Sequence, residues 1–250
     1  MSKLEQVYGL HAVTSLLNHN AAAVTVIYAQ AGRRDKRIQS ILDKAAHAGI
    51  AVEECSRQEL DQRCPHVHQG IVAMSQASTR EYHEQDLDAL LDNLDHPPFL
   101  LILDGVTDPH NLGACLRSAD AAGVTAVIFP KDKSADVNDV ARKVASGAAE
   151  AVPWVRVTNL ARTIESLQQA GVWVIGTDGD AETTLYDQDL TGPCALVLGS
   201  EGSGMRRLTR ERCDFVVRLP MSGSVSSLNV SVAAGVCLFE AVRQRAQRTK

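Results

Sequence analysis

Apolar residues near the start of the chain follow two different spacings. Short runs rich in β-branched residues are typical of strands, whereas apolar residues that recur every three or four positions are typical of a helix. Strands are expected at 24–30, 50–55 and 70–76, with helices at 35–49 and 57–64 between them. The alternation predicts a small α/β domain over residues 1–76.

A second, longer region repeats the alternation. Residues 77–98 are polar and acidic and end in two prolines, which cannot continue a helix, so they are expected to link two domains. The run FLLILDGV (99–106) is almost wholly apolar, as in strands covered on both faces. Further strands are expected at 125–130, 153–157, 172–177, 194–199 and 214–220, and helices at 111–122, 137–149, 159–170 and 226–245. This order predicts a mostly parallel, doubly wound sheet over 99–250.

The stretch PMSGSVSSLNVSVAAG (220–235) leads into the last helix and has no charged or aromatic residue. Its first half is expected to be a loop, with Ser226 or Ser227 as the helix N-cap. Apolar residues then almost surround the helix, which is typical of a buried helix. One apolar seam is formed by Leu228, Val232, Val236 and Phe239.

Charge and composition limit the class of protein without fixing its partner. The chain has 250 residues, a net charge of −5 and 45% hydrophobic residues, as in ordinary folded domains. A net acidic chain does not indicate nucleic-acid binding. However, basic residues gather at 33–37, 206–212 and 243–250, where they either contact phosphate or form solvated helix faces.

Neither a membrane nor a metal site is indicated. No run is apolar and long enough to span a bilayer, and the N-terminus lacks the features of a signal peptide, so a cytoplasmic location is expected. The six cysteines form no CxxC pair and are expected to be buried free thiols. Cys64, His66 and His68 are one local cluster without a distant partner, which favours a polar loop over a metal site.

Candidate chemistry lies in four loops at strand ends, DGVTDPHN, GTDGD, GSEGSGM and PMSGSVSSLN. Ligands of doubly wound sheets bind at this edge. The dinucleotide fingerprint is absent, which argues against a nicotinamide oxidoreductase. The P-loop and the GxSxG elbow are absent as well. Asn111 either caps a helix or serves the site, and Gly113 is expected to leave space beside Arg117 on the same helix face. From the residues alone, an α/β enzyme with a nucleotide-like ligand is the interpretation.

Three segments together resemble a known family. NLGACLRSADAAG with the preceding DPH, LVLGSEGSGM and LPMSGSVSSLNVSVAAGV resemble, in order, the three motifs of the SpoU (TrmH-like) branch of the SPOUT methyltransferases. The resemblance covers residues 99–245. The N-terminal segment resembles the L30e-like substrate-binding domain that many members carry.

The resemblance implies a fold, a cofactor and an assembly. The catalytic domain should be an α/β fold with a C-terminal trefoil knot, an exception to the rule against threaded chains. It should bind S-adenosyl-L-methionine through three loops and form a homodimer whose active site draws on both subunits. Cofactor positions implied by the motifs are Thr177, Gly199, Ser200, Leu219, Met221, Leu228 and Asn229. Catalytic positions implied in the same way are Asn111, Arg117, Glu201, Ser227 and Asn229.

The reaction implied by the resemblance is methylation of the ribose 2′-hydroxyl of a specific guanosine in 23S ribosomal RNA, in the peptidyl-transferase region. Alternatives are a tRNA methyltransferase of the same family and a non-catalytic RNA-binding protein. Arg117 is the base suggested for the family, but a guanidinium normally keeps its proton. We therefore expect Arg117 to orient a phosphate and stabilise the developing alkoxide, Ser227 and Asn229 to position the ribose or Arg117, and Glu201 to orient Arg117 or nearby backbone.

Overall fold

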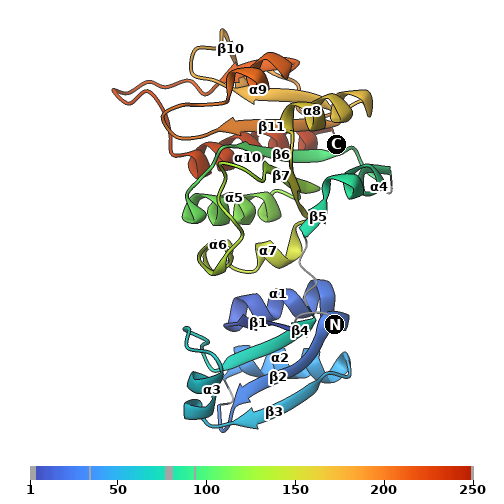
Figure 1. Ribbon diagram of the computed structural model, residues 1–250, viewed down its shortest axis with the longest axis vertical. Coiled ribbons are helices and arrows are strands. Elements are labelled where there is room, and N and C mark those ends of the chain that lie inside the picture. The colour runs from blue at the N-terminus through green and yellow to red at the C-terminus, as the bar shows by residue number, and fades with distance from the viewer. Residues whose placement is uncertain (1–3, 34, 77–80, 93, 249–250) are drawn as a thin grey trace. The chain divides into compact units, whose positions relative to one another are not determined.

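The computed structural model describes residues 4–33, 35–76, 81–92 and 94–248, and Figure 1 shows the elements. The chain divides into two compact units. One comprises Met1–Arg80 with Ser146–Ala151, and the other comprises Glu81–Ala145 with Val152–Lys250. Each unit has its own sheet.

The N-terminal unit is a four-stranded sheet covered by helices. Its strands are β1 (Leu4–Tyr8), β2 (Val24–Gln30), β3 (Ala51–Cys55) and β4 (Ile71–Gln76), and its helices include α1 (Leu10–Asn20), α2 (Lys36–His47) and α3 (Arg57–Arg63). The strand order is β1-β4-β2-β3, with β2 parallel to β3 and β4 antiparallel to both its neighbours. Asp35 caps α2, whose buried residues Ile38, Ile41 and Ala45 pack in the core. The predicted small α/β domain is confirmed, and β1 and α1 are additional to the predicted elements.

The second unit contains an eight-stranded sheet. Its strands are β5 (Glu81–His83), β6 (Phe99–Asp104), β7 (Ala126–Pro130), β8 (Trp154–Val157), β9 (Trp173–Thr177), β10 (Thr183–Thr184), β11 (Cys194–Gly199) and β12 (Phe215–Arg218). Its helices include α4 (Leu87–Asp92), α5 (Pro109–Ala121), α6 (Asp139–Ala145), α8 (Leu160–Gln169), α9 (Arg207–Arg212) and α10 (Val230–Arg248). A further helix, α7 (Ala148–Ala151), belongs to the first unit. The predicted mostly parallel sheet is confirmed, because each strand pairing described in this sheet is parallel. The trefoil knot stays a prediction.

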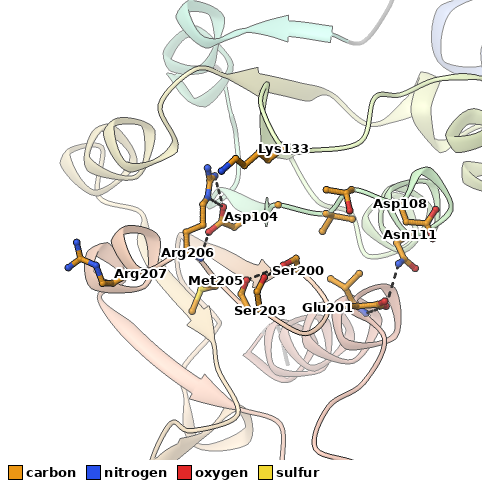
Figure 2. Close-up of a pocket in the computed structure, with 15 residues that line it drawn as sticks. Asp104, Asp108, Asn111, Lys133, Ser200, Glu201, Ser203, Met205, Arg206 and Arg207 are labelled. Carbon is orange, nitrogen blue, oxygen red and sulfur yellow. Dashed lines mark hydrogen bonds and ion pairs between the residues drawn. The ribbon is translucent and has the colours of Figure 1, made fainter.

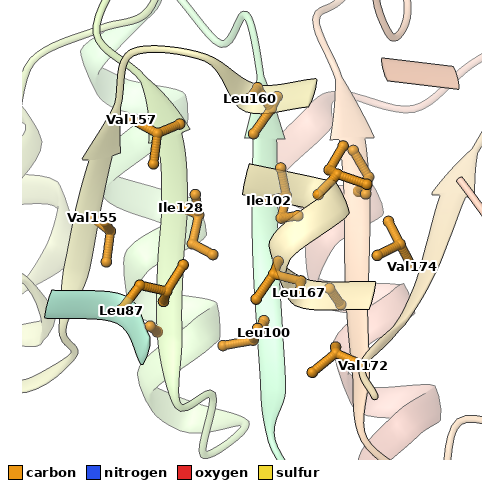
Figure 3. Packing of buried hydrophobic residues seen from close by; sticks show 14 residues of the cluster. Leu87, Leu100, Ile102, Ile128, Val155, Val157, Leu160, Leu167, Val172 and Val174 are labelled. Atoms are coloured by element: carbon orange, nitrogen blue, oxygen red, sulfur yellow. The ribbon is translucent and has the colours of Figure 1, made fainter. Parts of the chain in front are cut away.

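The core explains why the central strands are so apolar. Strands β6 and β7 are buried along their whole length. On one face, shown in Figure 3, Leu100, Ile102 and Ile128 pack with Leu160 and Leu167 of α8. Part of the segment expected as a linker also joins this unit: β5 pairs with β8, and Leu87 of α4 lies in the same core.

The strand order places a switch point beside β6. The order is β10-β12-β9-β11-β6-β7-β8-β5, so β6 pairs both with the next strand in the chain and with the distant strand β11. Asp104 and Gly199, the last residues of β6 and β11, are paired in register. Loops diverge from such a point and leave room for a ligand.

The prediction of a buried seam on α10 was wrong. Val232 is 52% exposed and Phe239 is 49% exposed, whereas Ala234, Cys237 and Leu238 on another face are buried. The helix packs against α5 and β11 with that second face. Apolar periodicity indicated the exposed seam, but it does not indicate whether the covering partner belongs to the same chain.

Candidate active site

A cavity of about 700 Å³ lies at the carboxyl ends of β6 and β11 (Figure 2). Segments distant in sequence line it: the loop from β6 to α5, the loop after β7, the turn after β11 and the start of α10. Lining residues with polar side chains include Asp104, Asp108, Asn111, Lys133, Ser200, Glu201, Ser203, Arg206 and Arg207. Its position is the one that the strand order predicts for a ligand site.

The turn after β11 projects Glu201 toward this cavity. Ser200 and Gly204 exchange two backbone hydrogen bonds of 3.0 Å, and Gly204 adopts a φ of 66°. A Cβ on Gly199 would lie 2.0 Å from the carbonyl carbon of Gly204, so this close approach requires glycine. The backbone therefore fixes the turn that carries Glu201.

Asn111, Glu201 and Asn229 form one hydrogen-bonded group, which we name the amide–carboxylate cluster. Glu201 Oε1 accepts from Asn111 Nδ2 at 3.4 Å, from Asn229 Nδ2 and from the Val230 backbone N–H at 3.3 Å. Asn229 Nδ2 also donates to Asn111 Oδ1 at 3.0 Å. The structure thus brings together one predicted catalytic residue from each of the three motif segments.

One helix cap differs from the sequence-based expectation, and another decides between the two roles left open for Asn111. Helix α10 begins at Val230, and Asn229 caps it by accepting from the Ser231 N–H at 2.9 Å. Ser226 and Ser227 are exposed in the preceding loop, because the helix starts later than their hydroxyl-rich sequence suggested. Likewise, Asp108 caps α5, which frees the Asn111 side chain for the cluster.

The expected role of Gly113 beside Arg117 was also wrong. A Cβ on Gly113 would lie 2.4 Å from the Ala141 carbonyl oxygen and 2.9 Å from Val144 Cβ. The missing side chain therefore allows α5 and α6 to pack closely. Arg117 itself is exposed on α5, does not line the cavity and has no hydrogen bond or ion pair with the residues that the structure describes.

The predicted cofactor positions lie at neighbouring strand ends. Thr177 ends β9 and donates to the Val197 carbonyl at 3.0 Å, which joins β9 to β11. The backbone N–H of Asp178 donates to Val217 of β12 at 2.9 Å. Leu219, Met221 and Leu228 lie between β12 and α10. Of the predicted cofactor positions, only Ser200 lines the cavity described above.

The donor set of these loops fits a cofactor that carries a sulfonium. A Cβ on Gly179 would be 3.9 Å from the Ser226 carbonyl oxygen, so the loop after β9 lies beside the serine-rich segment. The segment 219–229 has no charged side chain and offers backbone groups, serine hydroxyls and the Asn229 amide. Asp178 is engaged by Arg210, whose Nε donates to Asp178 Oδ2 at 2.6 Å.

The arginines of the predicted patch at 206–212 all have acidic partners. Arg206 pairs with the buried Asp104. The other pairs are Arg207–Glu211, Arg210–Asp178 and Arg212–Glu165. The patch is therefore closer to neutral than its sequence suggested.

In the other two basic patches, some arginines form ion pairs or hydrogen bonds within the protein. Arg33 pairs with Asp35 at 2.8 Å and donates to the Gln69 carbonyl at 2.7 Å, and Arg34 lies outside the described residues. Near the C-terminus, Arg245 donates to the carbonyls of Leu190 and Gly192 and lies over the Phe99 ring. Lys250 also lies outside the described residues.

No metal or membrane feature is found in the part of the chain that the structure describes. It contains no group of three His, Cys, Asp or Glu residues able to hold a metal ion. His68 instead bonds Asp61 at 2.9 Å and accepts from the Gly70 N–H. None of the described helices has the length and hydropathy to cross a membrane. The six cysteines are free thiols, and burial raises the pKa of Cys115 and of Cys237 to about 12.

The pair formed by Asp104 and Arg206 was not predicted from the sequence. These residues are separated by 102 positions, so no local spacing joins them. The available signal was one acid at the end of the apolar run FLLILD, because a buried carboxylate needs a partner. The partner arginine could not be chosen among four in its patch.

Comparison with known proteins then decides the family. The model of the SpoU rRNA Methylase family matches residues 98–239, and the model of the RNA 2′-O ribose methyltransferase substrate-binding domain matches residues 6–81. The chain belongs to the SpoU rRNA methylase family. The resemblance found in the three motif segments is confirmed.

Relatives in this family match the chain over its length. The 23S rRNA (guanosine-2′-O-)-methyltransferase RlmB of Pseudomonas syringae pv. tomato is 58% identical over 250 residues, which is 100% of both chains. RlmB of Escherichia coli is 57% identical over 96% of this chain and 99% of its own. Among solved structures, the SpoU methyltransferase AviRb from Streptomyces viridochromogenes in complex with AdoMet has a TM-score of 0.77 and 27% identity, covering 98% of this chain and 91% of its own.

Proposed function

We propose that this chain is an S-adenosyl-L-methionine-dependent methyltransferase acting on the ribose 2′-hydroxyl of a guanosine in 23S ribosomal RNA. The observation that carries the proposal is the full-length identity of 57–60% to several RlmB enzymes, including the N-terminal domain. A tRNA substrate is less well supported, because the solved TrmH/SpoU tRNA modifying enzyme from A. aeolicus matches 66% of this chain. A ribosomal RNA substrate implies a cytoplasmic location.

The cofactor would be held at the ends of β9, β11 and β12. A sulfonium is an activated methyl donor, so methyl transfer requires neither a metal nor a covalent enzyme intermediate. The residues that would hold it are Thr177, Gly199, Ser200, Leu219, Met221, Leu228 and Asn229. The segment 219–229 has only backbone groups and uncharged side chains, so it places no positive charge against the sulfonium.

The protein's own task is to position the ribose and to stabilise its deprotonated oxygen. Arg117 would orient the RNA and stabilise the alkoxide as a cation. Glu201 would hold the amides of Asn111 and Asn229, which fixes the entry to the cofactor segment. Ser227, exposed at the end of that segment, would contact the ribose.

We further propose that the enzyme is a homodimer through the exposed seam of α10. An exposed apolar stripe of Val232, half-buried Val236 and Phe239 is suited to a self-complementary interface. Arg117 lies on α5, the helix that packs against α10, and has no hydrogen bond or ion pair with the amide–carboxylate cluster of its own chain. A second copy would bring its Arg117 to that cluster.

The function is tested with unmodified 23S ribosomal RNA and labelled cofactor. Arg117→Ala should abolish methyl transfer while cofactor affinity stays nearly unchanged, since Arg117 is not one of the predicted cofactor positions. Wild-type turnover by this variant at saturating RNA would refute the catalytic role assigned to Arg117. In cells lacking the protein, one 2′-O-methylguanosine should disappear from 23S ribosomal RNA.

A complementation experiment tests the shared site separately. Arg117→Ala and Glu201→Ala are each expected to be inactive. If one site uses Arg117 and Glu201 from different subunits, mixed dimers retain one intact site of two. Because half of a random mixture is mixed dimers, about one quarter of wild-type activity should return. No return of activity in verified mixed dimers would show that both residues act within one chain.

A further inference from the structure

The cavity has two chemically different ends. The amide–carboxylate cluster forms one end, and the proposed mechanism uses only that end. At the other end, Figure 2 shows Lys133 pointing toward the guanidinium of Arg206, which is bound to Asp104. These three residues have no role in the mechanism proposed above.

Asp104 fixes Arg206 through both its carboxylate oxygens. Oδ2 accepts from the Arg206 backbone N–H at 2.8 Å, and Oδ1 accepts from Arg206 Nε and Nη2, each at 2.5 Å. The Asp104 side chain is fully buried, whereas that of Arg206 is 46% exposed. A guanidinium has five N–H donors, and three of those of Arg206 have no acceptor among the described residues. The guanidinium is therefore held rigidly with donors to spare.

Lys133 supplies a second cation from a fixed loop. Its backbone has a φ of 55°, in the left-handed region that a non-glycine residue rarely adopts. The loop is attached to the cavity wall, because the Ala135 N–H donates to the Val106 carbonyl at 2.7 Å. The exposed Lys133 ammonium has no ion pair or hydrogen bond with the described residues.

The charges at this end do not balance. The negative charge of Asp104 is paired with Arg206, so the positive charge of Lys133 has no counter-ion at this end. The other acidic side chains of the lining form no ion pair with Lys133: Asp108 caps α5, and Glu201 holds the amide–carboxylate cluster. Two cations directed at one point repel each other unless an anion lies between them. A phosphate fits this arrangement, because its oxygens accept from a guanidinium and an ammonium together.

We propose that Lys133 and Arg206 bind one backbone phosphate of the RNA beside the methylated ribose, and that Asp104 is a positioning residue for Arg206. This inference rests on the proposed function. In RNA, the phosphate on the 3′-oxygen neighbours the 2′-hydroxyl of the same ribose. A cavity with a phosphate end and a ribose end therefore matches one nucleotide, and its volume is within the range of small-ligand sites.

Salt-dependent RNA binding and steady-state kinetics test the phosphate site. Lys133→Gln and Arg206→Gln in the full chain should each raise KM for unmodified 23S ribosomal RNA about tenfold, the loss expected for a charge-assisted hydrogen bond. Each should also make the negative slope of log affinity against log salt shallower by about 0.7, because one cationic contact to the phosphate is lost. Lys131→Gln is the matched control, since Lys131 is an exposed lysine of the same loop that does not line the cavity.

Asp104 is tested by non-additivity. Asp104→Asn should raise KM for RNA, and the double variant D104N/R206Q should bind RNA no more weakly than Arg206→Gln alone. Additive losses would show that Asp104 does not act through Arg206. If Asp104→Asn lowers the melting temperature too far for assay, the two cation variants still decide the proposal.

Three results would overturn the inference. The first is an unchanged KM and salt slope in both cation variants. The second is an equal loss in Lys131→Gln, which would indicate a diffuse surface charge. The third is weakened binding of S-adenosyl-L-methionine with an unchanged KM for RNA, which would assign the site to the carboxylate of the cofactor. Failure of the wild-type chain to methylate ribosomal RNA would instead refute the proposed function.

Discussion

Replacement of Phe239 by aspartate is the most direct perturbation of the proposed dimer. Full burial of an aromatic side chain removes about 150–250 Å² from water, and Phe239 is 49% exposed, so about 100 Å² is left for a partner to cover. At about 25 cal/mol per Å², this contributes about 2.5 kcal/mol per subunit. A twofold interface contains the residue twice, so the loss is about 5 kcal/mol. The dimer dissociation constant should rise by about a thousandfold or more.

Sedimentation equilibrium over a range of concentrations measures this change. The wild type should be dimeric at micromolar concentration, and Phe239→Asp should be monomeric there with an unchanged circular dichroism spectrum. Phe215→Asp is the matched control, because Phe215 on β12 is 41% exposed but lies outside the α10 seam. A folded Phe239→Asp variant with the wild-type dissociation constant would refute the assignment, as would a wild type that is monomeric at every concentration.

Two other substitutions test the turn and the cofactor loop. Gly199→Ala should lower the free energy of unfolding by about 1–3 kcal/mol and displace Glu201, because its Cβ would meet the Met205 nitrogen at 2.1 Å. Gly192→Ala has open space and should be neutral in the same urea titration. The Asp180 N–H and Arg210 hold the pKa of Asp178 below its usual value, so Asp178 stabilises the fold at neutral pH and loses this contribution as pH falls below about 4. Asp178→Asn should therefore lower the melting temperature at pH 7 and have a smaller effect at pH 3, and an equal effect at both values would contradict the assignment.

Local patterns were sufficient to predict a mostly parallel sheet and its buried strands. Runs such as FLLILD predict a strand because a parallel strand is buried on both faces, and β6 is buried throughout. The segment of β1 and α1 was not predicted. Family motifs supplied the cofactor and catalytic positions, which periodicity alone does not provide.

The errors have a common physical origin in contacts between distant residues. Gly113 was interpreted through its neighbour Arg117, but its space is taken by Ala141 of another helix. Asn229 caps α10 with its Oδ1 while its Nδ2 donates to Glu201 and Asn111, and no local spacing indicates these two partners. The Asp104–Arg206 pair could not be predicted for the same reason, because the two residues are far apart in the sequence. Long-range hydrogen bonds decide these details after local propensity has set the elements.

The amide of Asn229 has a consequence for how the site responds to substrate. Its Nδ2 group donates to Asn111 and Glu201, and its Oδ1 accepts from Ser231, so its hydrogen-bonding groups are already engaged. Asn229 thus acts as a junction of three chain segments. The conformational entropy lost in bringing these segments together is lost once, when the chain folds, and not at each encounter with RNA. Turnover can then be governed by how RNA and cofactor arrive and leave, with the catalytic frame already assembled.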